Sequence, residues 1–135
     1  MKEEVYSLPS AADSSLAVRT GFIRRTYLHV AGAIAAFALL EVLIFKSGLD
    51  FAITSTLLGS QYSWLIVLGV FMGVSYVADK FAHSQTSEGA QYFGLGLFVV
   101  AEAVIFVPIL HIAEGYFSGA ISTAAYITAL LVIGL

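Results

Sequence analysis

Charge and cysteine are what this sequence has least of. Of its 135 residues only 11% are charged while 59% are apolar, and none is a cysteine. Soluble domains usually carry about 25% charged residues, so this chain cannot cover a globular surface with polar groups, and lipid is the expected solvent. The absence of cysteine excludes a disulfide framework and a thiolate metal site.

Basic residues and catalytic motifs are also scarce. Six lysines and arginines, against nine acidic residues, are too few for a nucleic-acid-binding surface. The sequence contains no GxSxG, no HExxH and no phosphate-binding glycine loop, and the GxG of Gly94 and Gly96 follows no expected strand. Its three histidines show no metal-ligand spacing. We therefore expect no enzyme, no metal site, no cofactor and no nucleic-acid partner.

Three apolar runs approach the length that crosses a bilayer, for which about 20 helical residues are needed. A fourth run is shorter, and the polar first twenty residues lack the apolar core of a signal peptide. The sequence therefore predicts an all-α, multi-pass transmembrane helix bundle over residues 21–135, preceded by a cytoplasmic polar tail, 1–20. The expected spans are 27–45, 62–77, 92–112 and, incompletely, 121–135.

The charges of the loops predict the orientation. Basic residues near the membrane favour the cytoplasmic side, and Lys46 is the one basic residue that falls on the opposite side. The N-terminus should therefore be cytoplasmic. The short run 49–60 cannot cross, and we expect an interfacial helix or an ordered outer loop there. The basic residues that share the cytoplasmic side are Lys2, Arg19, Arg24, Arg25 and Lys80.

Two carboxylates fall inside the apolar runs. Glu102 lies near the middle of the third expected span, and Glu41 lies toward the outer end of the first. A central ionisable residue costs on the order of 3 kcal/mol on insertion scales, so both should face the bundle interior. We expect them to serve an ion or proton pathway, with Glu102 as the leading candidate. The alternative is a neutral acid that is hydrogen-bonded to a neighbouring helix.

Pro108 and His111 follow Glu102 in the same span. Pro108 removes one backbone hydrogen bond and should kink the helix, which leaves the carbonyl of Val104 free for an ion or a water molecule. His111 and Glu102 fall on opposite faces of a straight helix. We expect His111 to pair with Glu114 and to be the third pathway candidate. A plain kink and a satisfied interfacial histidine are the alternatives.

Small residues recur at helical spacing in two of the expected spans. Gly69 and Gly73 form a GxxxG in the second span, and Gly32 and Ala36 share that spacing in the first. This spacing lets two helix backbones approach closely in lipid. We therefore predict helix packing at these four positions, within one chain or between two. The alternative is that glycine and alanine are simply frequent in membrane helices.

Two stretches resemble the Bax-inhibitor/YccA-like family of membrane proteins. They are GFIRRTYLHVAGAIAAFALLE (21–41) and EGAQYFGLGLFVVAEAVIFVPIL (88–110). The resemblance covers most of 21–135 and implies a seven-helix fold, of which this chain holds about the first half. It also implies an ion-homeostasis function, namely a pH-sensitive Ca²⁺ leak channel. The alternative is a non-conducting interaction protein that regulates a protease or a cell-death partner.

The resemblance assigns a role to few residues. The paired aspartates that sense pH in the family lie in its last two helices and have no counterpart here. A basic residue at the cytoplasmic end of the second helix can contact that pair, and Lys80 occupies a comparable place, so it is the candidate cytoplasmic latch. The expected partners are the lipid bilayer, Ca²⁺ or H⁺ as the transported ion, and a membrane protein. The expected location is a bacterial plasma membrane, or an internal membrane in a eukaryote.

Overall fold

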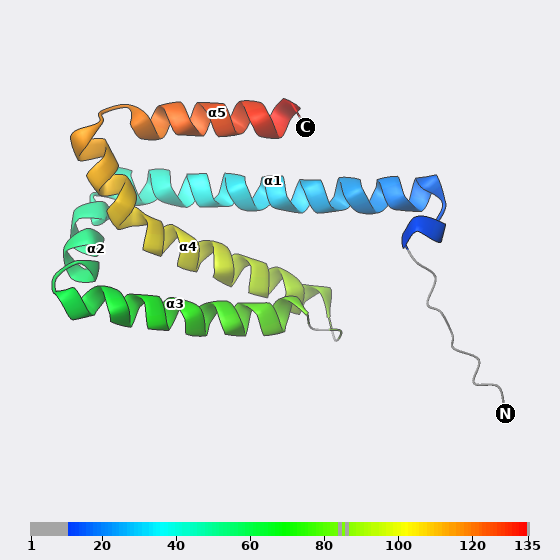
Figure 1. The fold of residues 1–135 in the computed structure, drawn as a ribbon, viewed down its shortest axis with the longest axis horizontal. Coiled ribbons are helices and arrows are strands. Elements are labelled where there is room, and N and C mark those ends of the chain that lie inside the picture. The colour runs from blue at the N-terminus through cyan, green and yellow to red at the C-terminus, as the bar shows by residue number, and fades with distance from the viewer. Residues whose placement is uncertain (1–10, 84, 86, 135) are drawn as a thin grey trace. The chain divides into compact units, whose positions relative to one another are not determined.

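The computed structural model describes residues 11–83, 85 and 87–134, and their regular structure is entirely helical (Figure 1). The all-α prediction is thereby confirmed for these residues. A 3₁₀ helix, Ala11–Asp13, precedes five α-helices: α1 (Leu16–Ser47), α2 (Leu49–Leu57), α3 (Gln61–Ala82), α4 (Glu88–Tyr116) and α5 (Ala120–Gly134).

Three of the described helices, α1, α3 and α4, are long and apolar enough to cross a membrane. The first three expected spans each lie inside one of them, and the helices extend beyond those spans at both ends. α5 is apolar but has only 15 residues. α1 begins at Leu16, inside the segment expected to be a polar tail, and residues 1–10 of that segment lie outside the described part.

The chain divides into two units, Met1–Gly32 and Ala33–Leu135. The described part of the first unit consists of the 3₁₀ helix and the N-terminal half of α1, in which Thr26 donates a hydrogen bond to the carbonyl of Phe22 (3.0 Å). The second unit contains the rest of α1 and the other four α-helices. Apart from Gly32, all candidate site residues lie in this second unit.

Glycine and serine form the turns on either side of α2. Gly48 has a φ of 73°, a left-handed conformation that glycine adopts without strain, and it joins α1 to α2. A Cβ atom at Gly59 would lie 2.8 Å from the carbonyl oxygen of Ser55, so the turn after α2 also requires glycine. The hydroxyl of Ser60 accepts a hydrogen bond from the amide of Ser63 (3.1 Å) and caps α3.

α3 and α4 form an antiparallel pair (Figure 1), and Gly94 permits their close approach. A Cβ atom at Gly94 would lie 2.6 Å from the carbonyl oxygen of Ala78 and 2.9 Å from the amide nitrogen of Ala82. No side chain fits between backbones this close, so the packing of the pair depends on glycine at this position. Aromatic rings pack beside it, with centroids 5.3 Å apart for Phe81 and Phe93 and 6.3 Å apart for Phe71 and Phe98.

Most of the buried residues of the second unit lie on α4. Val99, Ala103 and Val107 recur every four residues, which places them on one face of the helix, and all three are almost fully buried. Pro108 is also fully buried and lies inside the helix. Pro108 has no N–H to donate to the preceding turn, which favours a bend, and Figure 1 shows that the axis of α4 changes direction along its length.

Candidate functional site

Glu41 is the buried carboxyl group of the second unit. Only 6% of its surface is exposed, and it is the one charged residue in the described part of the chain that is buried. Neither carboxyl oxygen has a hydrogen-bond partner among the described residues. Buried polar groups are almost always hydrogen-bonded, because an unpaired one loses its water without compensation. The structure therefore leaves this carboxyl group open to a proton or a cation.

The burial of Glu41 follows from the face of α1 on which it lies. Phe37, one turn earlier, packs edge-on against Phe106 of α4, with ring centroids 5.6 Å apart and planes at 88°. Residues four apart share a helix face, so Glu41 lies on the face of α1 that meets α4. Leu39 and Leu43 lie on other faces of α1 and are exposed.

Glu102, the leading candidate from the sequence, is only half-buried. It lies one turn after Phe98, whose ring packs against Phe71 of α3, and one turn before Phe106, whose ring packs against Phe37 of α1. No hydrogen bond or ion pair of Glu102 occurs within the described residues. The sequence favoured Glu102 as the leading candidate because it lies near the middle of its apolar run. In the structure, Glu41 is the more enclosed of the two acids, although it lies nearer the end of its run.

His111 pairs with Asp50 of α2 and not with Glu114. Its Nδ1 lies 2.7 Å from Oδ2 of Asp50, and the ring of Phe51 lies 6.2 Å from the imidazole, centroid to centroid. Glu114 instead accepts a weak hydrogen bond from the amide of Gly119 (3.4 Å). The expected His111–Glu114 pair is therefore wrong. Spacing along one helix could not reveal a partner 61 residues away that α2 brings onto α4.

These polar groups do not converge on a metal centre. Within residues 11–83, 85 and 87–134, no group of three or more His, Cys, Asp or Glu side chains is arranged to hold a metal ion. Glu41 and the Asp50–His111 pair are therefore separate features that both adjoin α4. The arrangement can exchange protons and offer single oxygen ligands, but it does not supply a complete coordination sphere.

The comparison with protein families identifies the chain. The family described as "Inhibitor of apoptosis-promoting Bax1" matches residues 19–135, a range that includes α2 to α5 and nearly all of α1. The chain belongs to the Bax inhibitor-1 family. The resemblance inferred from the sequence is thereby confirmed. With its three long apolar helices, this Bax inhibitor-1 family protein is an integral membrane protein. Searches of curated proteins and of solved structures gave no significant match.

Lys80 of this Bax inhibitor-1 family protein lies exposed in the last turn of α3. Its ammonium group is 4.8 Å from the centroid of the Tyr76 ring, one turn earlier, which is a cation–π contact on the same helix. No acidic side chain of the described residues forms an ion pair with it. The latch role of Lys80 therefore stays a prediction.

The four small-residue positions for which helix packing was predicted are all exposed within the described residues. A Cβ atom at Gly69, Gly73 or Gly32 would meet no atom of the described residues within 4 Å, and Ala36 is exposed. Within the described part of the chain, the close approach between helices is at Gly94 instead. Gly94 also follows a small residue, Ala90, by four positions, a pair that was not singled out from the sequence. Packing of these four positions against a helix that the described residues do not include stays a prediction.

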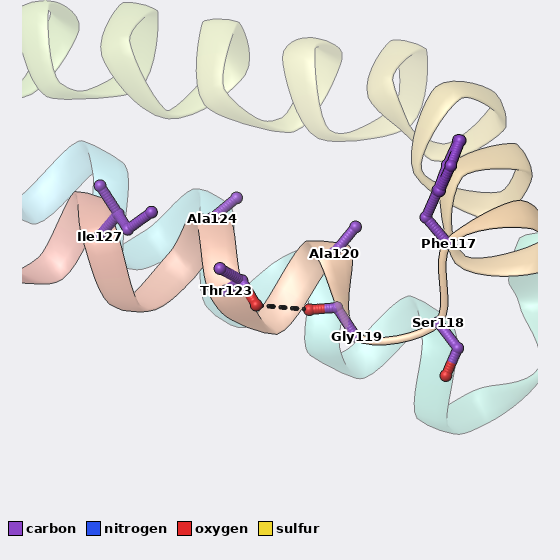
Figure 2. A pocket seen from close by; sticks show the side chains of 7 residues that line it. All are labelled: Phe117, Ser118, Gly119, Ala120, Thr123, Ala124 and Ile127. Atoms are coloured by element: carbon purple, nitrogen blue, oxygen red, sulfur yellow. Dashed lines mark hydrogen bonds between the residues drawn. The ribbon is translucent and has the colours of Figure 1, made fainter.

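An open depression lies at the turn between α4 and α5 (Figure 2). It has no titratable side chain, and the hydroxyl of Thr123 is already bound to the carbonyl of Gly119 (2.9 Å) in the first turn of α5. The depression is therefore not a candidate for proton or ion chemistry. It is lined by Phe117, Ser118, Gly119, Ala120, Thr123, Ala124 and Ile127.

Proposed function

We propose that this protein is an ion-homeostasis protein that lets cations, Ca²⁺ foremost, leak across the membrane in a proton-dependent way. The observation that carries the proposal is Glu41, whose two carboxyl oxygens are enclosed on the α4-facing side of α1 without a hydrogen-bond donor. A carboxylate in this position is satisfied by gaining a proton or a cation, and intramembrane acids commonly mark ion or proton pathways.

Further polar groups extend the proposed pathway along α4. Glu102 is half-buried on α4, and His111 lies at the end of that helix that α2 covers. Between them, Pro108 leaves the carbonyl of Val104 without the hydrogen bond that an amide would donate, so that this oxygen is a further ligand for an ion or a water molecule.

The loop charges support one orientation for the proposed leak. The N-terminus and Lys80 would face the cytoplasm, and α2 would lie on the outer side, in accordance with the positive-inside rule. The membrane would be a bacterial plasma membrane or an internal eukaryotic membrane. In this orientation, His111 and Asp50 meet the outer solution first, and Glu41 lies deeper along α1.

Ca²⁺ flux into liposomes tests the proposal. We expect the reconstituted protein to conduct Ca²⁺ at a rate that changes between about pH 6 and about pH 8. Glu41→Gln keeps the shape of the side chain but cannot carry a negative charge, so it should lower the Ca²⁺ flux at both pH values. Glu88→Gln, an exposed residue in the first turn of α4, should behave like the parent. A Ca²⁺ flux that Glu41→Gln leaves unchanged would refute the role given to Glu41.

The alternative is a non-conducting interaction protein that regulates a protease or a cell-death partner in the membrane. It is favoured by Gly69 and Gly73, which leave one face of α3 open to another helix. The same flux experiment separates the two functions. Liposomes that stay sealed to Ca²⁺ at both pH values, although the protein is folded and inserted, would favour the interaction protein over the leak.

A further inference from the structure

α2 is a short helix with a glycine at each end, and it packs mainly against α4. Gly48 precedes it in a left-handed conformation, and Gly59 follows it in a turn where a Cβ atom would clash. None of the nine residues of α2 is buried. The hydroxyl oxygen of Thr54 is enclosed without a hydrogen-bond partner in the described residues, which disfavours the docked position. The position of α2 therefore depends on partly buried contacts, mainly with α4.

A hydrogen bond between Asp50 and His111 ties α2 to α4. The two side chains are only 17% and 33% exposed, and their N···O distance is 2.7 Å. The chain offers a comparison in His83 and Asp79 at the C-terminal end of α3, which lie 3.1 Å apart with side chains 78% and 68% exposed. Partial burial reduces screening by water, so the pair between α2 and α4 is the stronger of the two. It is also the one that joins two separate helices.

We propose that α2 is a proton-controlled lid. Protonation of His111 strengthens its bond to Asp50 and holds α2 against α4. Loss of that proton weakens the bond and lets α2 turn about Gly48 and Gly59 into an undocked position. The docked helix would regulate the access of ions to α4 at the end where His111 lies. This link to ion flow rests on the proposed function.

The direction of the effect follows from the donor. Neutral His111 still donates one hydrogen bond from Nδ1 to the Asp50 carboxylate when that nitrogen carries the proton, whereas the imidazolium forms a charge-assisted ion pair that adds the attraction between opposite charges. Imidazole ordinarily exchanges its proton between about pH 5 and 8. Docking should therefore be favoured in mild acid and weakened as the pH rises.

Few other charges surround this pair. Asp50 is the only charged side chain of α2, the element packed against His111. On α4, Glu114 lies one turn further on and is bonded toward the amide of Gly119. α5 carries no acidic or basic side chain. Elsewhere in the second unit, titratable side chains include Glu41 and Lys46 on α1, Tyr62 on α3, Tyr116 on α4 and Tyr126 on α5.

Two spin labels can measure the position of α2 directly, because the chain has no cysteine. Ser55→Cys on α2 and Val100→Cys on α4 are exposed positions suited to labelling. In the reconstituted protein, pulsed EPR should resolve a docked and an undocked distance. We expect the ratio of docked to undocked protein to be about tenfold higher at about pH 6 than at about pH 8.

Two variants and one control make the test specific. His111→Gln and Asp50→Asn each keep a side chain that can hydrogen-bond but cannot form the charge-assisted pair, so the ratio should no longer depend on pH. His83→Gln removes the exposed histidine of the Asp79 pair and should leave the pH dependence intact. A ratio that does not change with pH in the parent, or a change that survives His111→Gln, would overturn the proposal.

The distance measurement also separates the lid from the leak. A protein that conducts no Ca²⁺ but whose label distance shifts with pH through His111 would refute the proposed function and support the lid. A protein whose Ca²⁺ flux depends on Glu41 while the label distance stays constant at every pH would support the leak and refute the lid.

Discussion

Gly94→Leu should cause the largest loss of stability of any single substitution in the second unit. The new Cβ atom would lie 2.6 Å from the carbonyl oxygen of Ala78 and 2.9 Å from the amide nitrogen of Ala82. Both are backbone atoms of α3 and cannot rotate away, so the two helices must separate. Overpacking typically costs about 1–3 kcal/mol, and more where the backbone must move. We expect the free energy of unfolding, measured by SDS titration in detergent micelles, to fall by about 3 kcal/mol.

Gly96 provides the matched control for this substitution. It lies two residues further along α4, is exposed, and has no atom of the described residues within 4 Å of a Cβ atom placed on it. Gly96→Leu should be neutral, or should stabilise the protein by up to about 1 kcal/mol through better helix propensity. If Gly94→Leu and Gly96→Leu lowered stability equally, the close approach of α3 and α4 would be incorrect.

Glu41→Leu should stabilise the protein while it lowers the proposed Ca²⁺ flux. Leucine fills a similar volume and has no polar atoms, so it eliminates two buried oxygens that have no donor in the described residues. Replacing buried ionic groups by apolar ones of similar size commonly stabilises proteins by about 1–4 kcal/mol. We expect a gain in that range in the same SDS titration. A residue that lowers stability in this way is typical of functional sites, which often trade stability for activity.

Glu102→Leu is the comparison for Glu41→Leu. Because Glu102 is half-buried and keeps part of its solvation, its replacement should give a smaller gain in the free energy of unfolding. The order of the two gains tests which acid is the more enclosed. Loss of stability in Glu41→Leu would show that the carboxyl group has a partner that the described residues do not provide.

The long helices were predictable from the sequence because the width of the bilayer sets the length of an apolar run. The boundaries were not, since α1 begins at Leu16, well before its apolar run, in a segment whose arginines are compatible with a helix. The nine residues of α2 carry too little periodicity to distinguish a helix from a loop. Its helical state became clear only from the structure.

The candidate site was predictable in its chemistry but not in its geometry. An acid within an apolar run is visible in the sequence, so Glu41 and Glu102 were both found. Their relative depth depends on which side of each helix meets a neighbour, and nearly uniform apolar runs do not show this. The partnership of His111 with Asp50 depends on α2 folding back onto α4, which no local spacing encodes.

Thiol cross-linking between α1 and α4 tests most directly whether Glu41 is enclosed. Phe37→Cys and Phe106→Cys place thiols where two rings now meet, with centroids 5.6 Å apart, in a chain without other cysteines. Leu39→Cys with Phe106→Cys is the control, because Leu39 lies on an exposed face of α1. A short bifunctional thiol reagent should join the first pair rapidly and the second pair slowly or not at all. Equal reaction of both pairs, or faster reaction of the control pair, would show that the Glu41 face of α1 does not pack on α4.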